Sequence, residues 1–327
     1  MMCTSKRAYG FPKMSNTQQE NQIVQSDSEA TLTTQIRQPA QIIAAISCFN
    51  EELFIGSVVL KTRDYVDQII VIDDGSTDKT ALVAEKAGAK VIRHGSNRGK
   101  AAGVSTAFEH AKRTGCKALV LLDGDGQHDP AYIPSLISPI IENKADMVVG
   151  SRYLEIKSSI PGFRRWGQRV LTSLTNLGSG VKLTDSQSGL RAFSPKAIQA
   201  FSFVERGLSV ESEMQFLARD AGIRVTEVPI STGYYGKAKR SPLAHGMGVL
   251  NSIMGLISRR IPLFFFGVPG LIMLGFGFWE GFRVIQGWDT YHDFWLGPAL
   301  IAVLLSVVGA LSLFTGIILH NIKSYVK

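Results

Sequence analysis

The chain has 327 residues, of which 45% are hydrophobic, and it carries a formal net charge of +8. This length allows one large domain or two modest ones, and the basic excess favours an anionic partner: a nucleic acid, a membrane surface or a phosphorylated substrate. The cysteines Cys3, Cys48 and Cys116 are too far apart for a cysteine metal site. They favour reduced thiols in a cytoplasmic domain, because stable disulfides belong to oxidising compartments.

Residues 1–40 are rich in Ser, Thr, Gln and Asn and show no apolar periodicity. This composition predicts a disordered tail, since it offers too little apolar surface to form a core. No apolar stretch suited to a signal peptide occurs there, so the domain that follows is expected to stay in the cytoplasm.

Short apolar segments alternate with helix-like segments along the next part of the chain, residues 41–258. Strands are predicted at residues 41–47, 68–72, 90–93, 119–122, 146–150 and 223–230. Helices are predicted at about 53–65, 80–87, 100–113 and 209–221. Strands that alternate with helices form a parallel sheet with right-handed crossovers, so the sequence predicts an α/β domain.

The segment 119–130, LVLLDGDGQHDP, passes from a buried-strand pattern into two carboxylates, Asp123 and Asp125. Alternate residues of an extended chain point to the same side, so both can aim oxygen atoms at one spot. Clustered carboxylates repel each other unless a hard cation lies between them, which favours an Asp-x-Asp site for Mg²⁺ or Mn²⁺. The alternative is a polar turn after a buried strand. The segment alone supports the two interpretations about equally.

Polar clusters follow three of the predicted strands, at residues 50–52, 73–78 and 123–129. The carboxyl ends of parallel strands meet at one edge of the sheet, where such sheets bind ligands. This convergence favours a ligand site at that edge.

Residues 160–181 place large apolar residues at spacings of three and four, with Arg164, Arg165 and Arg169 off that stripe. The pattern is typical of a surface helix packed on the domain, and also of an interfacial helix on an anionic membrane. The acids Glu211 and Glu213 follow Ser209, and stabilisation of a helix start accounts for them. The basic loop 234–240 is either a solvated surface or a phosphate clamp.

Two runs without a charged residue, 261–279 and 294–319, contain 19 and 26 residues. About 20 apolar residues cross a bilayer, so two transmembrane helices are predicted, at about 261–281 and 294–319. They form a membrane segment over residues 259–327.

Basic residues flank this membrane segment on one side. Arg259 and Arg260 precede the first run, and Lys323 and Lys327 follow the second. The positive-inside rule therefore predicts a multi-pass protein of the cell membrane with both chain ends and the α/β domain in the cytoplasm.

Eight pieces of the sequence, in this order, resemble family 2 glycosyltransferases: FNE, VIDDGSTDKT, NRGKA, LLDGDGQHDP, GSRY, DSQSGLRAF, ESEM and the Lys-rich loop. Within the family they are most similar to the branch that glycosylates dolichyl or polyprenyl phosphate, including enzymes like dolichyl-phosphate mannose synthase. GQRVLTSLTN, LSVESEM and FFFGVPG look most like archaeal members that serve protein N-glycosylation. The resemblance covers residues 41–270.

The resemblance implies a GT-A fold, which is a Rossmann-like, mixed and mostly parallel sheet with flanking helices. It implies that the nucleotide-sugar binds at the carboxyl edge of the sheet, and two C-terminal spans are common in the branch. The residues that it assigns to the donor are Asn50, Glu51, Asp73, Asp74 and Lys100. Of these, Asp74 is expected at the nucleoside.

For the metal, the resemblance implies Asp125 and Gln127 as ligands, with Asp123 beside them and more concerned with the nucleotide. Arg152 and Arg165 match positions that hold the lipid phosphate.

A loop with Ser188 and Arg191 matches the one that closes the acceptor site. Lys239 matches a lysine near the donor diphosphate, although it follows Ala238 where the motif has serine.

These assignments describe a metal-dependent, inverting glycosyl transfer. A lipid phosphate is already a nucleophile near neutral pH, because the second pKa of a phosphomonoester is about 6. A metal on the leaving diphosphate and arginines on the attacking phosphate would offset the repulsion between them. The archaeal-like pieces favour UDP-glucose or UDP-N-acetylglucosamine as the donor, with GDP-mannose as the alternative.

Other classes of protein fit the sequence less well. A processive polysaccharide synthase would carry a Gln-x-x-Arg-Trp motif after the catalytic acids, whereas Arg165-Trp166 comes early and lacks the glutamine. A non-catalytic, membrane-anchored protein that binds nucleotide-sugars is disfavoured by the intact Asp-x-Asp. A nucleic-acid-binding protein is remote, since no aromatic-basic module is present. Polyprenol length and the choice between monomer and homo-oligomer stay open.

Overall fold

The computed structural model describes residues 42–154, 162–203, 210–233, 242–291 and 295–325. The predicted tail and the basic loop that contains Lys239 lie outside these residues, so both stay predictions.

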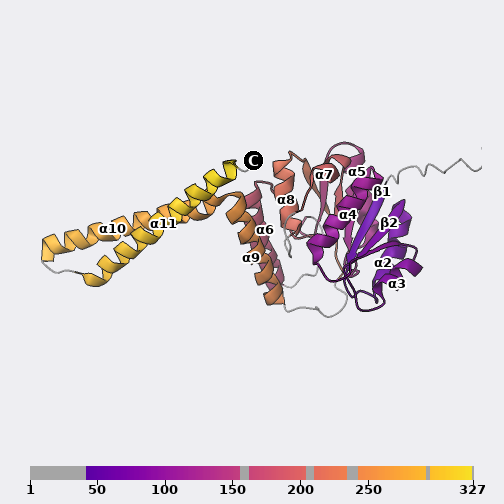
Figure 1. The fold of residues 1–327 in the computed structure, drawn as a ribbon, viewed down its shortest axis with the longest axis horizontal. Coiled ribbons are helices and arrows are strands. Elements are labelled where there is room, and N and C mark those ends of the chain that lie inside the picture. Colours follow the sequence, from indigo (N-terminus) through magenta and orange to yellow (C-terminus); the bar gives the residue numbers. More distant parts are fainter. Residues whose placement is uncertain (1–41, 155–161, 204–209, 234–241, 292–294, 326–327) are drawn as a thin grey trace, which may run out of the picture. The chain divides into compact units, whose positions relative to one another are not determined.

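A seven-stranded sheet forms the centre of the α/β domain, in the order β3-β2-β1-β4-β6-β5-β7 (Figure 1). The strands are β1 Ile42–Cys48, β2 Gln68–Asp73, β3 Lys90–Arg93, β4 Ala118–Asp123, β5 Met147–Ser151, β6 Arg191–Phe193 and β7 Val225–Pro229. Neighbouring strands are parallel except at β6, which runs antiparallel to β4 and β5. The sheet is therefore mixed and mostly parallel, as predicted.

The helices of the described residues are α2 Ile55–Thr62, α3 Thr80–Lys86, α4 Lys100–Thr114, α5 Ile133–Ile141, α6 Gly162–Ser179, α7 Pro195–Ala200, α8 Val210–Asp220, α9 Pro242–Arg260, α10 Val268–Tyr291 and α11 Leu296–Tyr325. Most agree with the predicted segments, but α5, α7 and α9 were not predicted. The α5 sequence, IPSLISPII, is dense in apolar residues and contains Pro139 inside the helix, which hides the helical period.

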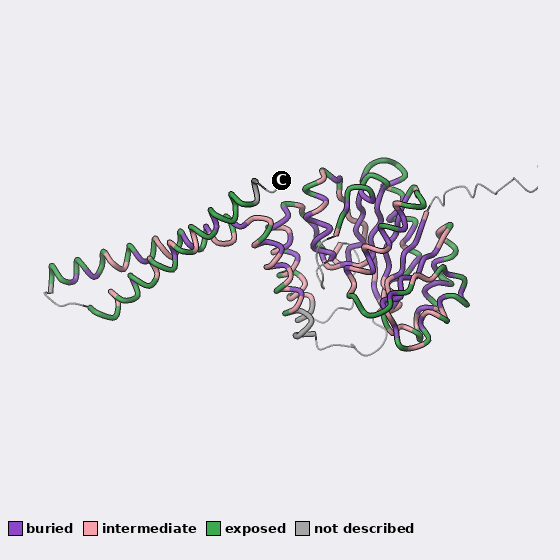
Figure 2. Tube along the Cα trace, in the orientation of Figure 1, coloured by how far each residue is buried: buried purple, intermediate pink, exposed green. Residues whose placement is uncertain are grey.

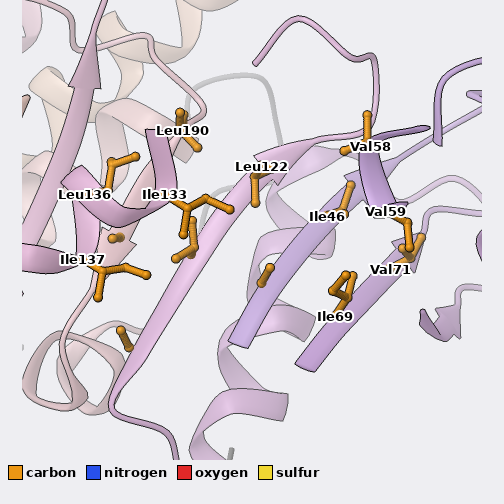
Figure 3. Packing of buried hydrophobic residues seen from close by; sticks show 14 of the residues in the cluster. Ile46, Val58, Val59, Ile69, Val71, Leu122, Ile133, Leu136, Ile137 and Leu190 are labelled. Carbon is orange, nitrogen blue, oxygen red and sulfur yellow. The ribbon is translucent and has the colours of Figure 1, made fainter. Parts of the chain in front are cut away.

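Both faces of the sheet are buried, which explains why the central strands are continuous apolar runs. One face packs on α2, α3 and α5 through residues such as Ile46, Val59 and Ile133 (Figure 3). The opposite face packs on α4, α7 and α8, with Phe108 and Met214 among the buried residues. Successive residues of a strand point to opposite faces, so one strand supplies both cores.

Helix α6 contacts its surroundings in two different ways. Towards α9 the contact is apolar, with Leu171 and Leu174 packed on a cluster that includes Ile253. Towards the α/β domain it combines Phe216 of α8, which belongs to the same apolar cluster, with several hydrogen bonds. The hydrogen bonds there join Tyr153 to Gln168, Thr172 to Ser186, Thr175 to Ser212 and Asn176 to Gln215.

The two C-terminal helical segments, Leu263–Thr290 and Leu296–Ile322, are long and apolar enough to cross a membrane. They pack side by side, and most of their surface is exposed (Figures 1 and 2). The first continues past residue 281, where the sequence predicted its end, as far as Tyr291. Arg283 donates to Glu280 at 2.9 Å one turn away, so the helix pairs its own charges.

Small residues and one hydroxyl group join the two spans. A Cβ atom on Gly270 would lie 2.7 Å from the carbonyl oxygen of Gly309, so glycine allows the backbones to meet. A π-helical turn at Leu263–Gly267 opens the first span, and Ser312 Oγ donates to the carbonyl of Phe266 at 2.8 Å. This bond gives the carbonyl of Phe266 a partner at the π-helical turn.

An ion-pair cluster around Asp146 lies at the edge of the sheet opposite the carboxyl ends of the parallel strands. Arg224 Nε lies 3.0 Å from Asp146 Oδ2, and the Arg224 amide donates to the same oxygen at 3.1 Å. Hydrogen bonds from Arg224 outweigh burial and lower the pKa of Asp146 to about 2. Asp146 is buried, so it depends on these partners for its charge.

Replacing Asp146 by alanine should lower the free energy of unfolding by about 2–3 kcal/mol, because charged hydrogen bonds are lost from a buried site. The folded pKa lies below the ordinary value of about 3.9, so the wild-type contribution is complete above about pH 4 and disappears as the pH falls through about 2. Thermal unfolding of the detergent-solubilised chain measures both effects. Glu142→Ala, which breaks an exposed pair with Lys144, is the control and should change stability far less, because solvent screens that pair. Equal effects of the two substitutions would contradict the assignment.

Candidate active site at the carboxyl edge of the sheet

The three polar clusters of the sequence come together where β1, β2 and β4 end. In the sheet register Ser47 lies beside Asp123 and Cys48 lies beside Asp73. The prediction that these segments share one edge is therefore confirmed. Gly124 also packs here, and an added Cβ would lie 2.8 Å from Cys48 Cβ, so the chain after β4 stays close to β1.

The two aspartates at the end of β2 organise the surrounding loops. Asp74 accepts hydrogen bonds from the amides of Arg98 and Gly99, at 3.0 and 2.8 Å, and lies 2.7 Å from His94 Nδ1. It thereby holds the loop that opens α4. Asp73 accepts from the Ser76 amide at 2.9 Å and pairs with Arg93 at 3.2 Å. Both carboxylates are buried and already hydrogen bonded within the chain.

A cavity of about 600 Å³ lies beside these aspartates. The residues that line it are Gly75, Ser76, Thr77, Arg93, His94 and Gly95. Asn50 fixes one side, because its Oδ1 accepts from the Thr77 amide at 2.8 Å and its own amide donates to Ser76 Oγ at 2.9 Å. Asn50 has a φ of 55°, a left-handed conformation that asparagine tolerates well. The Glu51 amide donates to Thr80 Oγ1, so the predicted Asn50-Glu51 turn is built into this wall.

Lys100, the first residue of α4, bridges two carboxylates. Its Nζ lies 2.7 Å from Asp123 Oδ1 and 2.6 Å from Glu211 Oε1. Burial alone would lower the pKa of Lys100, but the charges of Asp123 and Glu211 outweigh it and raise the pKa. Burial alone would likewise raise the pKa of Asp123, but Lys100 holds it below the ordinary value. Lys100 and Asp123 are therefore both charged at neutral pH.

Asp125 carries the excess negative charge of the site. Its Oδ1 accepts from the amide of Gln127 at 3.0 Å, which closes a short turn after β4. Burial and the nearby charge of Asp123 raise the pKa of Asp125 to about 6, despite that hydrogen bond. A carboxylate made this basic by its neighbours is stabilised by any cation that binds it.

The donor set fits a divalent cation whose coordination is completed by substrate. Among the described residues, no group of three or more His, Cys, Asp or Glu side chains is arranged to hold a metal ion. Mg²⁺ is commonly held by one or two carboxylates together with substrate phosphates. Asp125 and the amide oxygen of Gln127 are the groups that would hold it here, with the Asp123 carboxylate adjacent.

His128 borders the same carboxylates from a buried position. Its Nε2 lies 3.9 Å from Asp123 Oδ2, and its backbone pairs with Thr232. Burial lowers the pKa of His128 to about 4, although Asp123 opposes the shift. The imidazole is therefore neutral at physiological pH.

The loop between α6 and β6 covers the site from the other side. Arg152 forms a fork-like pair with Asp185, at 2.6 and 2.8 Å. Arg191 is fully buried and donates to the carbonyls of Ser186, Ser188 and Glu211. These bonds fix the shape of the loop.

At the tip of this loop Gly189 touches Asp123. A Cβ atom on Gly189 would overlap Asp123 Oδ2 and lie 3.2 Å from Lys100 Nζ. Only glycine permits so close an approach. Ser188 is buried nearby, and its Oγ has no hydrogen-bond partner among the described residues.

Not all of the predicted site residues lie together. The residues that the carboxyl edge brings together are Asn50, Glu51, Asp73, Asp74, Lys100, Asp123, Asp125 and Gln127. Ser188, Arg191 and Arg152 belong to the covering loop or its partners, and Arg165 lies on α6. Their contacts with a ligand stay predictions, as does that of Lys239.

Residues that the sequence did not single out also contribute. Glu211 was explained as a helix-start acid, yet its side chain turns inward to Lys100. His94 and Asp185 pair with predicted site residues. The position of Asp185 within the DSQSGLR segment was a usable signal, whereas no local pattern indicates the partners of Glu211 or His94.

Comparison with known proteins agrees with this geometry. Residues 44–201 match the model of the family described as glycosyl transferase family 2. The UDP-N-acetylglucosamine–dolichyl-phosphate N-acetylglucosaminyltransferase of Methanococcus voltae is 33% identical over 67% of this chain and 97% of its own length. The polyprenol monophosphomannose synthase of Mycolicibacterium smegmatis is 27% identical over 60% of this chain and 78% of its own.

The solved structure of glucosyl-3-phosphoglycerate synthase from Mycobacterium tuberculosis, in complex with Mg²⁺ and UDP, resembles the fold. Its TM-score is 0.54 at 21% sequence identity, over 67% of this chain and 80% of that one. The likeness supports the predicted GT-A architecture of the sheet and its helices.

The raised pKa of Asp125 predicts a pH-dependent cation site. A cation must displace the proton below pH about 6, so the Kd for Mn²⁺ should increase up to about tenfold per pH unit there and level off above about pH 7. Titration of the purified chain with Mn²⁺ from pH 5 to 8, followed by the electron paramagnetic resonance signal of free Mn²⁺, measures this. Asp125→Asn should lose both the tighter binding and its pH dependence. A flat profile for the wild type would contradict the prediction.

Proposed function

Because the chain belongs to glycosyl transferase family 2, we propose that it transfers a sugar from a nucleotide-sugar to a polyprenyl phosphate at the membrane. Dolichyl phosphate is the acceptor, and UDP-N-acetylglucosamine or UDP-glucose is the donor. The observation that carries the proposal is the pair Asp123 and Asp125, which lies at the same carboxyl edge of the sheet as Asp73, in a chain that also has two membrane-length helices. The similarity to the Methanococcus voltae enzyme, along nearly its whole length, supports the choice of substrates.

The donor nucleotide occupies the cavity beside Asp73 and Asp74, and its diphosphate lies towards Asp125. Asn50 and the loop held by Asp74 shape the cavity walls. A divalent cation at Asp125 and Gln127 would offset the charge of the leaving diphosphate. Because Lys100 holds Asp123, the Asp123 carboxylate does not turn towards the negatively charged diphosphate.

The acceptor phosphate attacks the anomeric carbon from the side opposite the diphosphate and inverts its configuration. The lipid phosphate carries most of its second negative charge near neutral pH, so it needs no general base. The chain must instead attract this anion to a site that is already negative. Arg152 and Arg165 supply the positive charge, and the Asp185 pair holds the guanidinium of Arg152 in one orientation.

The membrane hairpin explains how enzyme and acceptor meet. A polyprenol cannot leave the bilayer, so the catalytic domain is kept beside it by α10 and α11. The basic residues that flank the spans, including Arg259 and Arg260, favour a cytoplasmic catalytic domain, where nucleotide-sugars are available.

The proposal is tested with the full chain in detergent or vesicles, supplied with dolichyl phosphate, Mn²⁺ and in turn UDP-N-acetylglucosamine, UDP-glucose and GDP-mannose. We expect a charged lipid whose mass equals dolichyl phosphate plus one sugar, with a UDP-sugar as the best donor. Mass spectrometry of the extracted lipid identifies it. A product with GDP-mannose alone would correct the donor, and no lipid product with any donor would contradict the function.

Asp125→Ala should reduce the rate of transfer at least about 100-fold, because the cation would lose its principal carboxylate. Asp129→Ala is the matched control from the same segment. Asp129 is exposed and accepts only a capping bond from the Ala131 amide, so its variant should transfer sugar at nearly the wild-type rate. Near-normal activity of Asp125→Ala with metal present would refute the metal-site assignment.

Arg152→Lys keeps the charge but loses the two-pronged geometry, so it should raise the KM for dolichyl phosphate about tenfold and leave the KM for the donor unchanged. Initial rates with each substrate varied in turn measure both constants. Arg113→Ala, at the exposed end of α4, removes a charge far from the site and should change neither. A change in the donor constant alone would show that Arg152 does not serve the acceptor.

A further inference from the structure

Glu211 is an acidic residue of the first turn of α8 whose side chain is turned into the protein. The residue is 6% exposed, and its Oε1 lies 2.6 Å from Lys100 Nζ. An acid that only stabilised a helix start would do so from the surface, since that interaction needs no burial. Removing a carboxylate from water is costly unless it is paired. The inward position of Glu211 therefore requires its ion pair with Lys100.

Glu211 is also held in place from its backbone. Its carbonyl accepts a hydrogen bond from Arg191 Nη1 at 2.9 Å, and Arg191 binds two carbonyls of the loop that covers the site. The first turn of α8 and the covering loop are thus one fixed unit. The carboxylate of Glu211 meets Lys100 in a position set by that unit.

Lys100 couples the position of the Glu211 carboxylate to that of the Asp123 carboxylate. A lysine ammonium group on a flexible stem has three donors and no preferred direction, so a single partner would leave it free to pivot. The two carboxylates of Asp123 and Glu211 together fix the position of the Lys100 ammonium group. Asp123 in turn has Oδ1 on Lys100 and Oδ2 against Gly189, with His128 at 3.9 Å. Its carboxylate cannot turn unless Lys100 moves.

We propose that Glu211 is a positioning residue of the donor site, which shares Lys100 with Asp123 and so sets the orientation and charge that receive the cation and nucleotide diphosphate. The inference rests on the proposed function and adds a residue to it. Without Glu211, Lys100 and Asp123 would form a neutral ion pair. With Glu211 present, two carboxylates share the single ammonium group of Lys100, so Asp123 is held in place without taking up the whole of that cation.

The test is the binding of Mn²⁺ with UDP, and separately with GDP, to the full chain carrying Glu211→Gln. The amide keeps the shape of the side chain and removes its charge. We expect the Kd for Mn²⁺ in the presence of nucleotide to rise about tenfold, the size expected for loss of one charge-assisted contact. The paramagnetic resonance of free Mn²⁺ reports binding without any turnover. Glu109→Gln, an exposed acid on α4, is the control for loss of one charge and should bind as the wild type does.

A double substitution shows whether Glu211 acts through Lys100. In a Lys100→Met background, Glu211→Gln should change the Kd less than about twofold, because the link that couples Glu211 to Asp123 is already absent. Additive effects of the two substitutions would overturn the proposal. So would a Glu211→Gln chain that binds Mn²⁺ and nucleotide normally but transfers sugar slowly, because Glu211 would then contact the reacting groups.

If Glu211→Gln does not fold, Glu211→Asp gives the answer. The shorter acid keeps the charge but withdraws the carboxylate from Lys100, so a smaller rise in Kd is expected, and unchanged binding would overturn the proposal. A wild-type chain that binds neither nucleotide would contradict the proposed function itself. The two failures are therefore distinguishable.

Discussion

Repulsion between carboxylates at the end of β4 is the constraint to which the rest of the site responds. Asp123 and Asp125 follow one buried strand and cannot separate, because β4 is paired with β1 and β6 on its two sides. Lys100, at the start of α4, forms an ion pair with Asp123. Asp125 remains available to a cation, as its pKa of about 6 indicates. A cation that bound Asp125 would therefore stabilise its charged form.

The covering loop links this charged edge to helix α6. It contacts α6 through Ser186 and Thr172, and it touches Asp123 through Gly189. Helix α6 packs on α9 through an apolar interface, whereas its contact with the α/β domain adds hydroxyl and amide hydrogen bonds to the apolar Phe216. Polar contacts are directional, so they place α6 in one register on the domain. Arg152, through Asp185, and Asp123, through Gly189, are thereby both tied to one loop.

Much of the fold was predictable because the strands are buried on both faces and appear in the sequence as short, continuous apolar runs. β1 and β4 are examples. The helix α5 was missed, since its apolar residues are too dense and its prolines too frequent to show a period of 3.6. The first of the two apolar C-terminal helices was predicted to end at about residue 281 but continues to Tyr291, because the sequence does not reveal that Glu280 and Arg283 pair on one face of the helix. The family resemblance correctly indicated the mixed sheet.

The sequence by itself determined the chemistry of the edge: two aspartates spaced by one glycine, placed after a strand, together with two membrane-length apolar runs. Alternation along a strand and the common edge of parallel strands are local rules, so they need no coordinates. Only the tertiary structure decided which groups surround those aspartates. Glu211 lies 111 residues beyond Lys100 in the chain, and no local pattern indicates that the two are 2.6 Å apart. Likewise Arg191 matched a ligand-binding loop in sequence but is buried on three carbonyls, because long-range packing sets the direction of a side chain.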